Sequence, residues 1–414
     1  MPTRSIFWLT FVCGLVWLTA PSSAGAASPA VTTRTIFTGA NGAVPNNGVL
    51  LYDRQAIFGA TYAGGTFDQG VIFQVAASGA AEATVVHAFS GQDGAHPNGG
   101  LAVDAKGDLY GTTAAGGAHD LGVVFKLVRP ATLPGTWAFT ILHDFSGPDG
   151  AHPSAGPTLG PDGTLFGVAY DGGKVPCVAL YIHDEGCGTV FALSATAGFR
   201  VLHTFDGFPK EGAGPGTNLA IDPQGVIIGA TNKVTQSGDG GSLFAISPAG
   251  QFSNVSEFFP KALQGFPIGH IVRDTAGNVY GMSQSAGGRG STVQGSGIWK
   301  VAALTHQQLL LKILPGVISK SGIVMDNAGN FYGTATGSIS EVGVAGTGSV
   351  FVLSATGSLQ TYAALGLANL APMGGVIIDP TGLIWGTSSA GGQICPSSAS
   401  PADVGCGTVF SIAP

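Results

Sequence analysis

The chain has 414 residues, of which 44% are apolar and only 9% are charged, and its formal net charge is −7. Basic residues stand singly, so the sequence lacks the basic patch by which proteins bind nucleic acid or anionic lipid, and we expect neither partner. The 68 glycines and 24 prolines, together with the lack of any long helical periodicity, favour an all-β fold.

Residues 1–26 have the pattern of a secretory signal peptide. Arg4 supplies the positive start, residues 6–18 form the apolar core, and Ala24-Gly25-Ala26 is a cleavage site. Beyond this segment no apolar run reaches the length of about 18 residues that a membrane span needs. We therefore expect residues 27–414 to form one domain, without a membrane span, that is secreted to the periplasm or the exterior.

One motif recurs seven times along the rest of the chain. In its clearest copy, GDLYGTTAAGG at residues 107–117 is followed by GVVFKL at residues 122–127. A period of about 50–60 residues built from short strands predicts a β-propeller. Each unit divides into four antiparallel strands, a to d. In the clearest copy strand a ends at Asp104, and the other strands cover residues 109–113, 122–128 and 139–145.

Two residue types recur at fixed places in the unit. Asp104 opens a D-x-x-G turn that returns at Asp222, Asp274, Asp326 and Asp379. Because aspartate bonds its own downstream amides, we interpret this carboxylate as turn chemistry rather than as a ring of ligands. Each strand b also contains a glycine, which we expect to make room for the neighbouring blade or the central axis; these are Gly59, Gly111, Gly167, Gly229, Gly281, Gly333 and Gly386.

The two ends of the chain predict how the ring closes. The seventh unit reaches Pro414 directly after its strand c, and an unmatched strand-like segment, residues 33–37, precedes the first unit. We predict that this N-terminal segment is the fourth strand of blade 7. The result is a closed seven-bladed β-propeller whose terminal units have no unpaired edge.

Cys13 lies in the signal segment, and four cysteines follow it: Cys177, Cys187, Cys395 and Cys406. Cys187 and Cys406 occupy the same repeat position, before Gly-Thr-Val-Phe, and each has a cysteine a short loop upstream. An even number of cysteines in an exported protein indicates disulfides, which we pair as 177–187 and 395–406. A zinc site formed by all four is the rival interpretation, although no C-x-x-C motif supports it.

The combined motif, D-x-x-G-x-[LV]-[YF]-G-T-T-x-x-G-G, then G-x-[VI]-F-x-[LV], then [VL]-H-x-F, then D-G-A-x-P-x-x-G-L, resembles the Gloeo/Verruco tandem repeat. That family consists of exported bacterial repeat proteins that often carry one of several C-terminal surface anchors. No sorting tail follows the last unit at Pro414, so the resemblance does not extend to surface anchoring. Blade 2 matches best, whereas blades 4 to 6 diverge: Gly-Thr-Thr becomes Gly281-Met282-Ser283 and strand d loses its histidine. The resemblance implies no established activity and supplies no catalytic residues.

In such a blade the b–c and d–a loops emerge on one face, which we call the loop face, and the a–b and c–d turns on the other, the turn face. The long, variable loops of blades 1 to 4 carry most of the chemically interesting side chains, and function concentrates on such loops. The candidate ligand-binding residues are Asp93, His96, His119, Asp149, His152, Asp171 and Asp206. His87, His143 and His203 share a strand face with phenylalanines, and we interpret them as packing residues.

No nucleophile elbow, zinc-protease motif, EF-hand loop or phosphate-binding loop occurs, so catalytic residues stay unassigned and we expect no metal and no cofactor. The preferred hypothesis is a monomeric binding module, without enzymatic activity, for carbohydrate or protein. One alternative is an extracytoplasmic hydrolase or lyase that uses the Asp and His residues of the blade 1 to 4 loops. The other is a purely structural envelope protein. An enzyme should gather acids or histidines with perturbed pKa values at the channel mouth, and a lectin-like binder should show exposed aromatic rings beside polar groups.

Overall fold

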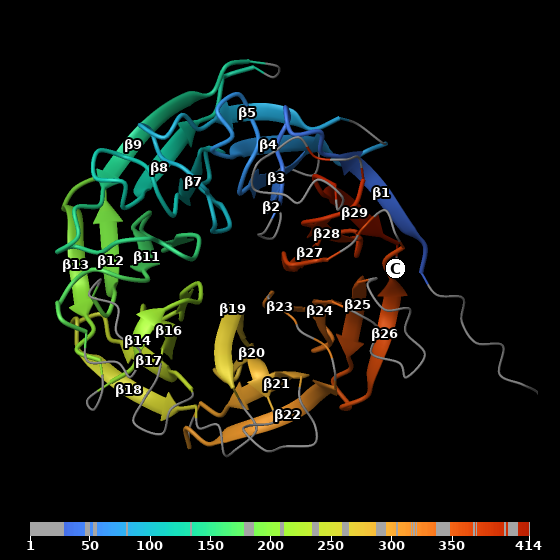
Figure 1. The fold of residues 1–414 in the computed structure, drawn as a ribbon. Helices are drawn as coiled ribbons and strands as arrows, with labels where there is room; N and C mark the ends of the chain where they lie inside the picture. The colour runs from blue at the N-terminus through green and yellow to red at the C-terminus, as the bar shows by residue number, and fades with distance from the viewer. Residues whose placement is uncertain are drawn as a thin grey trace, which may run out of the picture.

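The structure is a computed structural model, and it consists of small antiparallel sheets arranged as a ring (Figure 1). The residues described are 29–45, 50–52, 56–79, 82–132, 135–177, 186–207, 211–233, 240–258, 265–286, 295–303, 305–315, 317, 319, 321–336, 348–366, 369, 371–392, 395 and 405–413. Within these ranges there are strands and turns but no α-helix, and the strands form seven sheets. The predicted all-β, seven-bladed propeller is confirmed. The predicted signal peptide lies outside the described residues.

In the first four blades the strands follow one another from the axis to the rim. Blade 1 contains β2 (Leu50–Tyr52), β3 (Ala56–Thr61), β4 (Val71–Ala76) and β5 (Thr84–Ala88). Blade 2 contains β6 (Ala102–Val103), β7 (Leu109–Thr112), β8 (Val123–Val128) and β9 (Ala138–Asp144). Blade 3 contains β10 (Thr158–Leu159), β11 (Leu165–Ala169), β12 (Thr189–Ser194) and β13 (Gly198–Thr204). In blade 4, β14 (Ala213–Pro215) and β15 (Ala220–Ile221) both pair with β16 (Ile227–Lys233), followed by β17 (Ser242–Ile246) and β18 (Phe252–Glu257).

The remaining three blades complete the ring. Blade 5 contains β19 (Phe266–Arg273), β20 (Val279–Ala286), β21 (Gly295–Val301) and β22 (Gln308–Pro315). Blade 6 contains β23 (Ile323–Met325), β24 (Phe331–Thr336), β25 (Gly348–Leu353) and β26 (Leu359–Ala364). Blade 7 contains β27 (Val376–Ile378), β28 (Ile384–Ser388), β29 (Thr408–Ile412) and, at the rim, β1 (Val31–Ile36).

The N-terminal strand closes the ring as predicted, because β1 pairs antiparallel with β29 and the two lie side by side in Figure 1. Its register shift between Thr33 and Thr35 matches the shift that the outer strand pair of blades 1 to 6 shows at the strand-c aromatic residue. A shared bulge position marks β1 as a true strand d. Phe37, directly after β1, is fully buried in the core between blades 7 and 1.

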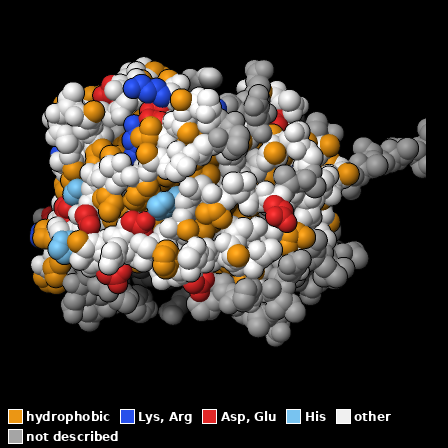
Figure 2. Space-filling model, turned by 90° about the horizontal axis from the view of Figure 1, so that it is seen from above, with side chains coloured by type: hydrophobic (Ala, Val, Ile, Leu, Met, Phe, Trp, Pro, Cys, Tyr) orange, Lys and Arg blue, Asp and Glu red, His pale blue; other side chains and the backbone are white. Residues whose placement is uncertain are grey.

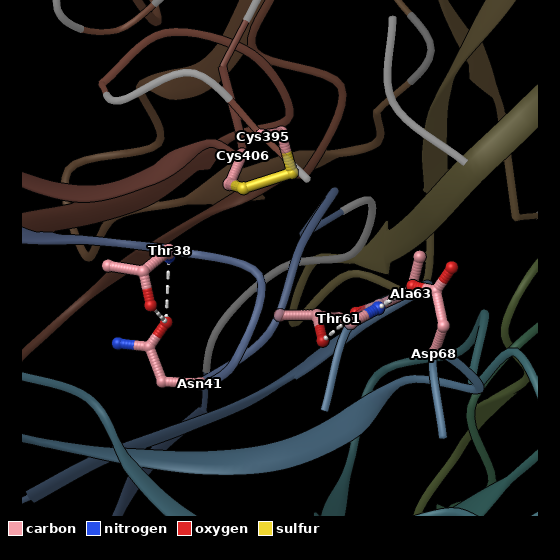
Figure 3. Close-up of a disulfide and its surroundings, with 8 residues drawn as sticks. Thr38, Asn41, Thr61, Ala63, Asp68, Cys395 and Cys406 are labelled. Atoms are coloured by element: carbon pink, nitrogen blue, oxygen red, sulfur yellow. Dashed lines mark hydrogen bonds between the residues drawn. A yellow bond between two sulfur atoms is a disulfide. The ribbon is translucent and has the colours of Figure 1, made fainter. Parts of the chain in front are cut away.

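The seam between the chain ends continues beyond the strands (Figure 3). The turn after β1 is held by Asn41, whose Oδ1 accepts hydrogen bonds from the Thr38 amide (2.8 Å) and hydroxyl (3.1 Å). The amide of Val44 then donates to the carbonyl of Cys406 (2.9 Å), which is disulfide-bonded to Cys395. The first and last units are therefore joined by a sheet ladder and by loop contacts.

The core sits between blades rather than within them. Each of the seven clusters of buried side chains joins two neighbouring blades, and each includes at least one large strand-c or strand-d side chain. A blade buries both faces in this way, which explains why a chain with so few charges folds as a compact ring. Fully burying one phenylalanine contributes about 1.5–3 kcal/mol.

The reason why each strand b contains a glycine differs from the one that the sequence suggested. Each pairs across the ladder with the strand-c aromatic residue of its own blade, as Gly111 does with Phe125. A Cβ added at Gly111 would lie 2.4 Å from the Phe125 ring, and the other six glycines meet the ring of their own strand c at 2.3–2.5 Å. The glycine thus makes room for a ring in the same blade, and the expectation of crowding by a neighbouring blade or the axis was wrong.

Candidate functional site

The turn face is built by the repeated aspartates. Asp104 Oδ1 accepts hydrogen bonds from the amides of Lys106 (2.9 Å) and Asp108 (3.0 Å), and Oδ2 accepts one from the Tyr110 hydroxyl (3.0 Å). Asp274, Asp326 and Asp379 repeat the pattern, with Tyr280, Tyr332 and Trp385 as the ring donors. The interpretation of these carboxylates as turn chemistry is confirmed.

On the rim, the strand-d histidines join neighbouring blades in an arrangement that we call the histidine clasp. In each clasp the ring stacks on a phenylalanine of the next blade, with centroids 3.4–4.0 Å apart and planes within 7°, and Nε2 meets a carboxylate at 2.8–3.0 Å. Figure 2, which views the ring edge-on from the side of β5 and β9, shows histidine, acidic and hydrophobic side chains gathered on this rim. The three clasps are His87–Asp93–Phe139, His143–Asp149–Phe199 and His203–Glu211–Phe252.

The clasp confirms that the strand-d histidines are packing residues. It also shows that two candidate ligand residues, Asp93 and Asp149, contact a histidine of their own blade. Asp149 also accepts hydrogen bonds from the Ser146 amide (2.9 Å) and hydroxyl (3.0 Å), as Asp93 does from Ser90. Burial acts to raise the pKa of Asp149, but the hydrogen bonds from Ser146 and His143 outweigh it and the pKa is lowered. Burial lowers the pKa of His87, against the opposing effect of Asp93. A ligand contact for either aspartate stays a prediction.

In blade 3 the clasp carboxylate comes from Glu211 and not from Asp206, the residue singled out in the sequence. Glu211 is buried and bonds both His203 and the Asp206 amide. Asp206 Oδ1 instead accepts a hydrogen bond from the Lys174 ammonium group at 2.6 Å. Asp206 therefore lies at an exposed ion pair between two loops.

The residue before proline in five of the d–a loops links neighbouring loops on the loop face. It has a positive φ at Val44, His96, His152, Gly214 and Ala371. Its amide donates to the preceding blade, as His152 does to Leu121, and its carbonyl accepts from its own blade, as His152 does from Tyr170. Since side chains of every size occupy this position, the backbone does not require histidine at it.

The two histidines at this position differ in their partners. His96 stacks on Tyr62 with centroids 4.4 Å apart, and its Nδ1 lies 2.9 Å from the Tyr62 carbonyl oxygen. His152 places Nδ1 3.3 Å from Oδ2 of Asp171, and its side chain is 36% exposed. Blade 3 therefore brings together two of the predicted residues, His152 and Asp171, and the carboxylate orients the imidazole.

Asp171 is a departure of blade 3 from blades 1 and 2, and blade 4 also departs there, with Lys233 paired to Ala213. The backbone bridge that pairs Ala43 with Ala63 in blade 1 and Ala95 with Ala115 in blade 2 pairs Ala151 with Asp171 in blade 3. Asp171 is only 6% exposed. A buried carboxylate costs free energy that an alanine at this position avoids, and blades 1 and 2 show that the fold accepts alanine. Departures of this kind are expected at functional sites.

The sequence analysis missed Tyr170, which precedes Asp171, and Asn232, which lies beside Tyr170. Burial and then the charge of Asp171 raise the pKa of Tyr170, while a hydrogen bond from Asn232 opposes them. Asn232 occupies the equivalent position in blade 4, and its Oδ1 is buried with no hydrogen-bond partner among the described residues. A Cβ at Gly216 would lie 2.5 Å from Asn232 Nδ2 and 3.7 Å from Tyr170 Cε2, so the amide and the phenol both border this glycine. We call His152, Tyr170, Asp171 and Asn232 the blade 3/4 site.

The tips of the first three b–c loops hold the exposed apolar and imidazole side chains of the loop face. Phe67 is 56% exposed and Val175 is 58% exposed. His119, a predicted ligand residue, is exposed at the matching position of blade 2. The aspartates that follow the first two tips cap their own loops, since Asp68 and Asp120 each accept an amide hydrogen bond at 2.8 Å.

The sequence analysis did not single out a further histidine, His270, because blade 5 diverges from the repeat. His270 lies in β19, the inner strand of blade 5, yet a Cβ added at Gly100 of blade 2 would lie 3.7 Å from its Cε1. Blades 2 and 5 are not neighbours in the ring, so this side chain reaches across the axis. Burial lowers its pKa. The sequence did contain one signal for His270, which is a histidine on a predicted inner strand.

Both predicted disulfides are present, Cys177–Cys187 in the b–c loop of blade 3 and Cys395–Cys406 in that of blade 7. This pairing replaces the rival zinc arrangement. Among the described residues no group of three or more His, Cys, Asp or Glu side chains is placed to hold a metal ion. No helical segment within the same residues has the length and hydropathy of a membrane span.

The fold and the loop-face site thus define a disulfide-containing seven-bladed β-propeller. The family model of the Gloeobacter/Verrucomicrobia repeat matches residues 14–181 and 132–312, and the chain belongs to this family. Curated protein sequences gave no match.

Solved structures resemble the chain in fold. A protein from Lactobacillus plantarum has a TM-score of 0.51 at 16% identity, over 80% of this chain and 88% of that one. A protein of Bacteroides fragilis, described as a candidate 6-phosphogluconolactonase, has a TM-score of 0.50 at 15% identity, over 81% and 88%. A gluconolactonase of Xanthomonas campestris has a TM-score of 0.44 at 12% identity, over 78% and 88%. At these identities the Lactobacillus plantarum and Bacteroides fragilis structures support the fold and nothing more.

Proposed function

We propose that this protein is a secreted binding module whose loop face recognises carbohydrate at the blade 3/4 site. The observation that carries the proposal is Asp171, a buried carboxylate at a repeat position where blades 1 and 2 have alanine. A buried acid at a repeat position where the fold also accepts alanine is typical of a functional site. Two disulfides support export, since disulfides persist in oxidising compartments.

The chemistry of the site favours a polyhydroxylated ligand. The carboxylate accepts hydrogen bonds, the phenol and the amide both donate and accept, and the buried Oδ1 of Asn232 has no donor among the described residues. Sugar hydroxyl groups supply donors and acceptors to such a set, and a satisfied acceptor removes a cost of about 1–3 kcal/mol. A broad exposed apolar patch would favour a protein partner, whereas the large exposed apolar side chains at the described b–c loop tips, Phe67 and Val175, stand on separate blades.

The test begins with a glycan array probed with the mature, disulfide-bonded chain, followed by calorimetric titration of the glycans that bind. Asp171→Ala reproduces blades 1 and 2, so it should fold normally and weaken binding at least about 10-fold, which corresponds to about 1.4 kcal/mol. Tyr170→Phe should also weaken binding, and His96→Ala should weaken it less than Asp171→Ala does. His306→Asn, at an exposed c–d turn of the turn face, serves as the control.

Two results would overturn the proposal. The first is an array on which no glycan binds the folded chain. The second is a bound glycan whose affinity is unchanged in both Asp171→Ala and Tyr170→Phe, because the ligand would then contact another part of the ring.

A further inference from the structure

The blade 3/4 site contains a pair of side chains that ligand recognition alone does not require. A hydroxyl ligand requires donors and acceptors, but not an imidazole oriented by a buried carboxylate. His152 is held in this way, with Nδ1 3.3 Å from Asp171 Oδ2, a carboxylate oxygen of a side chain that is only 9% exposed. The 36% exposure of the histidine side chain gives water access to the imidazole.

No other histidine in the described part of the chain combines these features. The clasp histidines also meet carboxylates, but each is sandwiched against a phenylalanine of the next blade and is only 18–19% exposed. His96, at the same repeat position as His152, meets a backbone carbonyl and lies flat on Tyr62. An accessible imidazole with a buried carboxylate behind it therefore occurs at His152.

We propose that the blade 3/4 site hydrolyses carboxylic esters of carbohydrates, with His152 as the general base. The inference rests on the proposed function, because it assumes that the carbohydrate part of the substrate binds at Tyr170 and Asn232. A general base accelerates such reactions about 10²–10⁴-fold. Asp171 is a positioning residue: it holds the ring and stabilises the imidazolium that forms.

The step balances with water as the only co-reactant. His152 Nε2 takes a proton from a water molecule whose oxygen attacks the acyl carbon, forming a C–O bond. Collapse of the tetrahedral intermediate breaks the bond between the acyl carbon and the alcohol oxygen, and the imidazolium returns its proton to that oxygen. The products are a carboxylic acid and the free sugar hydroxyl.

Ester cleavage fits the residues better than glycoside cleavage. Glycosidases need two carboxyl groups about 5–10 Å apart on opposite sides of the scissile bond. In the blade 3/4 site the carboxylate of Asp171 is engaged with His152. A single base paired with a carboxylate suits addition of water to a carbonyl.

The experiment uses the mature chain with p-nitrophenyl acetate and glucose pentaacetate as probes, measuring nitrophenol and acetate release. His152→Asn removes the base while keeping a residue type that tolerates the φ of 52° at this position. It should lower kcat/KM at least about 100-fold. His306→Asn makes the same substitution at a φ of 53° on the turn face and should change kcat/KM less than about twofold.

Asp171→Asn separates positioning from folding. The amide keeps the size of the carboxylate and, unlike alanine, can still hydrogen-bond a sugar hydroxyl group, but it no longer stabilises a protonated imidazole. The value of kcat should therefore fall about 10-fold or more, and KM should change less than kcat does. The acidic limb of the pH profile should move to lower pH.

The possible negative results distinguish the hydrolytic proposal from the binding proposal. A chain that binds glycans but releases neither product above the buffer rate overturns the hydrolytic proposal and leaves the binding proposal standing. A chain that binds no glycan overturns both. Hydrolysis that survives His152→Asn places the activity elsewhere and overturns the assignment of the base.

Discussion

The clasp between blades 2 and 3 gives the sharpest prediction about stability. His143→Ala removes a hydrogen bond of 2.8 Å to Asp149 and a ring stacked 3.4 Å from Phe199. A hydrogen bond to a charged group contributes about 1.5–3 kcal/mol and an aromatic pair about 0.5–1.5 kcal/mol. We therefore expect the free energy of unfolding to fall by about 2–4 kcal/mol.

The measurement is equilibrium unfolding in guanidinium chloride, followed by tryptophan fluorescence with the disulfides intact. Lys312→Ala is the matched control, because Lys312 holds the same strand-d position in blade 5, where it is exposed. It should change stability by less than about 0.5 kcal/mol. A double-mutant cycle with Phe199→Leu should give a coupling energy of about 0.5–1.5 kcal/mol. A loss below about 0.5 kcal/mol in His143→Ala, or no coupling to Phe199, would refute the clasp as an inter-blade bond.

Three further predictions concern the repeat itself. Gly111→Ala places a Cβ 2.4 Å from the Phe125 ring and should destabilise the protein by about 1–3 kcal/mol in the same unfolding assay. Phe125→Leu should restore part of this loss, and a double mutant whose loss of stability equals the sum of the two single losses would contradict the clash. Burial raises the pKa values of Tyr280 and Tyr332 to about 12 from an ordinary 10.0, helped by the hydrogen bond to Asp274 and its charge at Tyr280, and by the charge of Asp326 and its hydrogen bond at Tyr332. The stabilisation by these two tyrosines should be complete below pH 10 and lost as the pH rises toward 12, and thermal melts of Tyr280→Phe/Tyr332→Phe should show less of this alkaline loss. Removing residues 29–37 exposes the edge of β29, so light scattering should detect aggregation of the shortened chain, whereas a monomer with unchanged melting would argue against closure by β1.

Most of the fold could be predicted from the sequence because a repeat displays its rules seven times. The strand-c aromatic, the D-x-x-G turn and the odd segment at residues 33–37 were sufficient for the blade number and for the closing strand. The cause of the strand-b glycines was misjudged, since Gly111 and Phe125 are 14 residues apart and only the register shows that they face each other.

The candidate site was harder to predict, because its meaning depends on which side chains meet. His152 and Asp171 were singled out, but so were Asp93 and Asp149, which the structure places in clasps with strand-d histidines. Tyr170 and Asn232 carry no motif, and their proximity depends on the packing of blade 4 against blade 3. A comparison of blade 3 with blades 1 and 2 would have shown an acid, Asp171, where they have alanine, and this internal comparison was the missed signal.

The most direct test of the central claim is a crystal structure of the mature chain with a bound glycan from the array. We predict glycan hydroxyl groups within hydrogen-bond distance of the Asp171 carboxylate, the Tyr170 phenol and the Asn232 amide, with the Asn232 Oδ1 atom accepting one of them. A glycan seated only on blades 5 to 7, or on the turn face, would contradict the assignment of function to the blade 3/4 site.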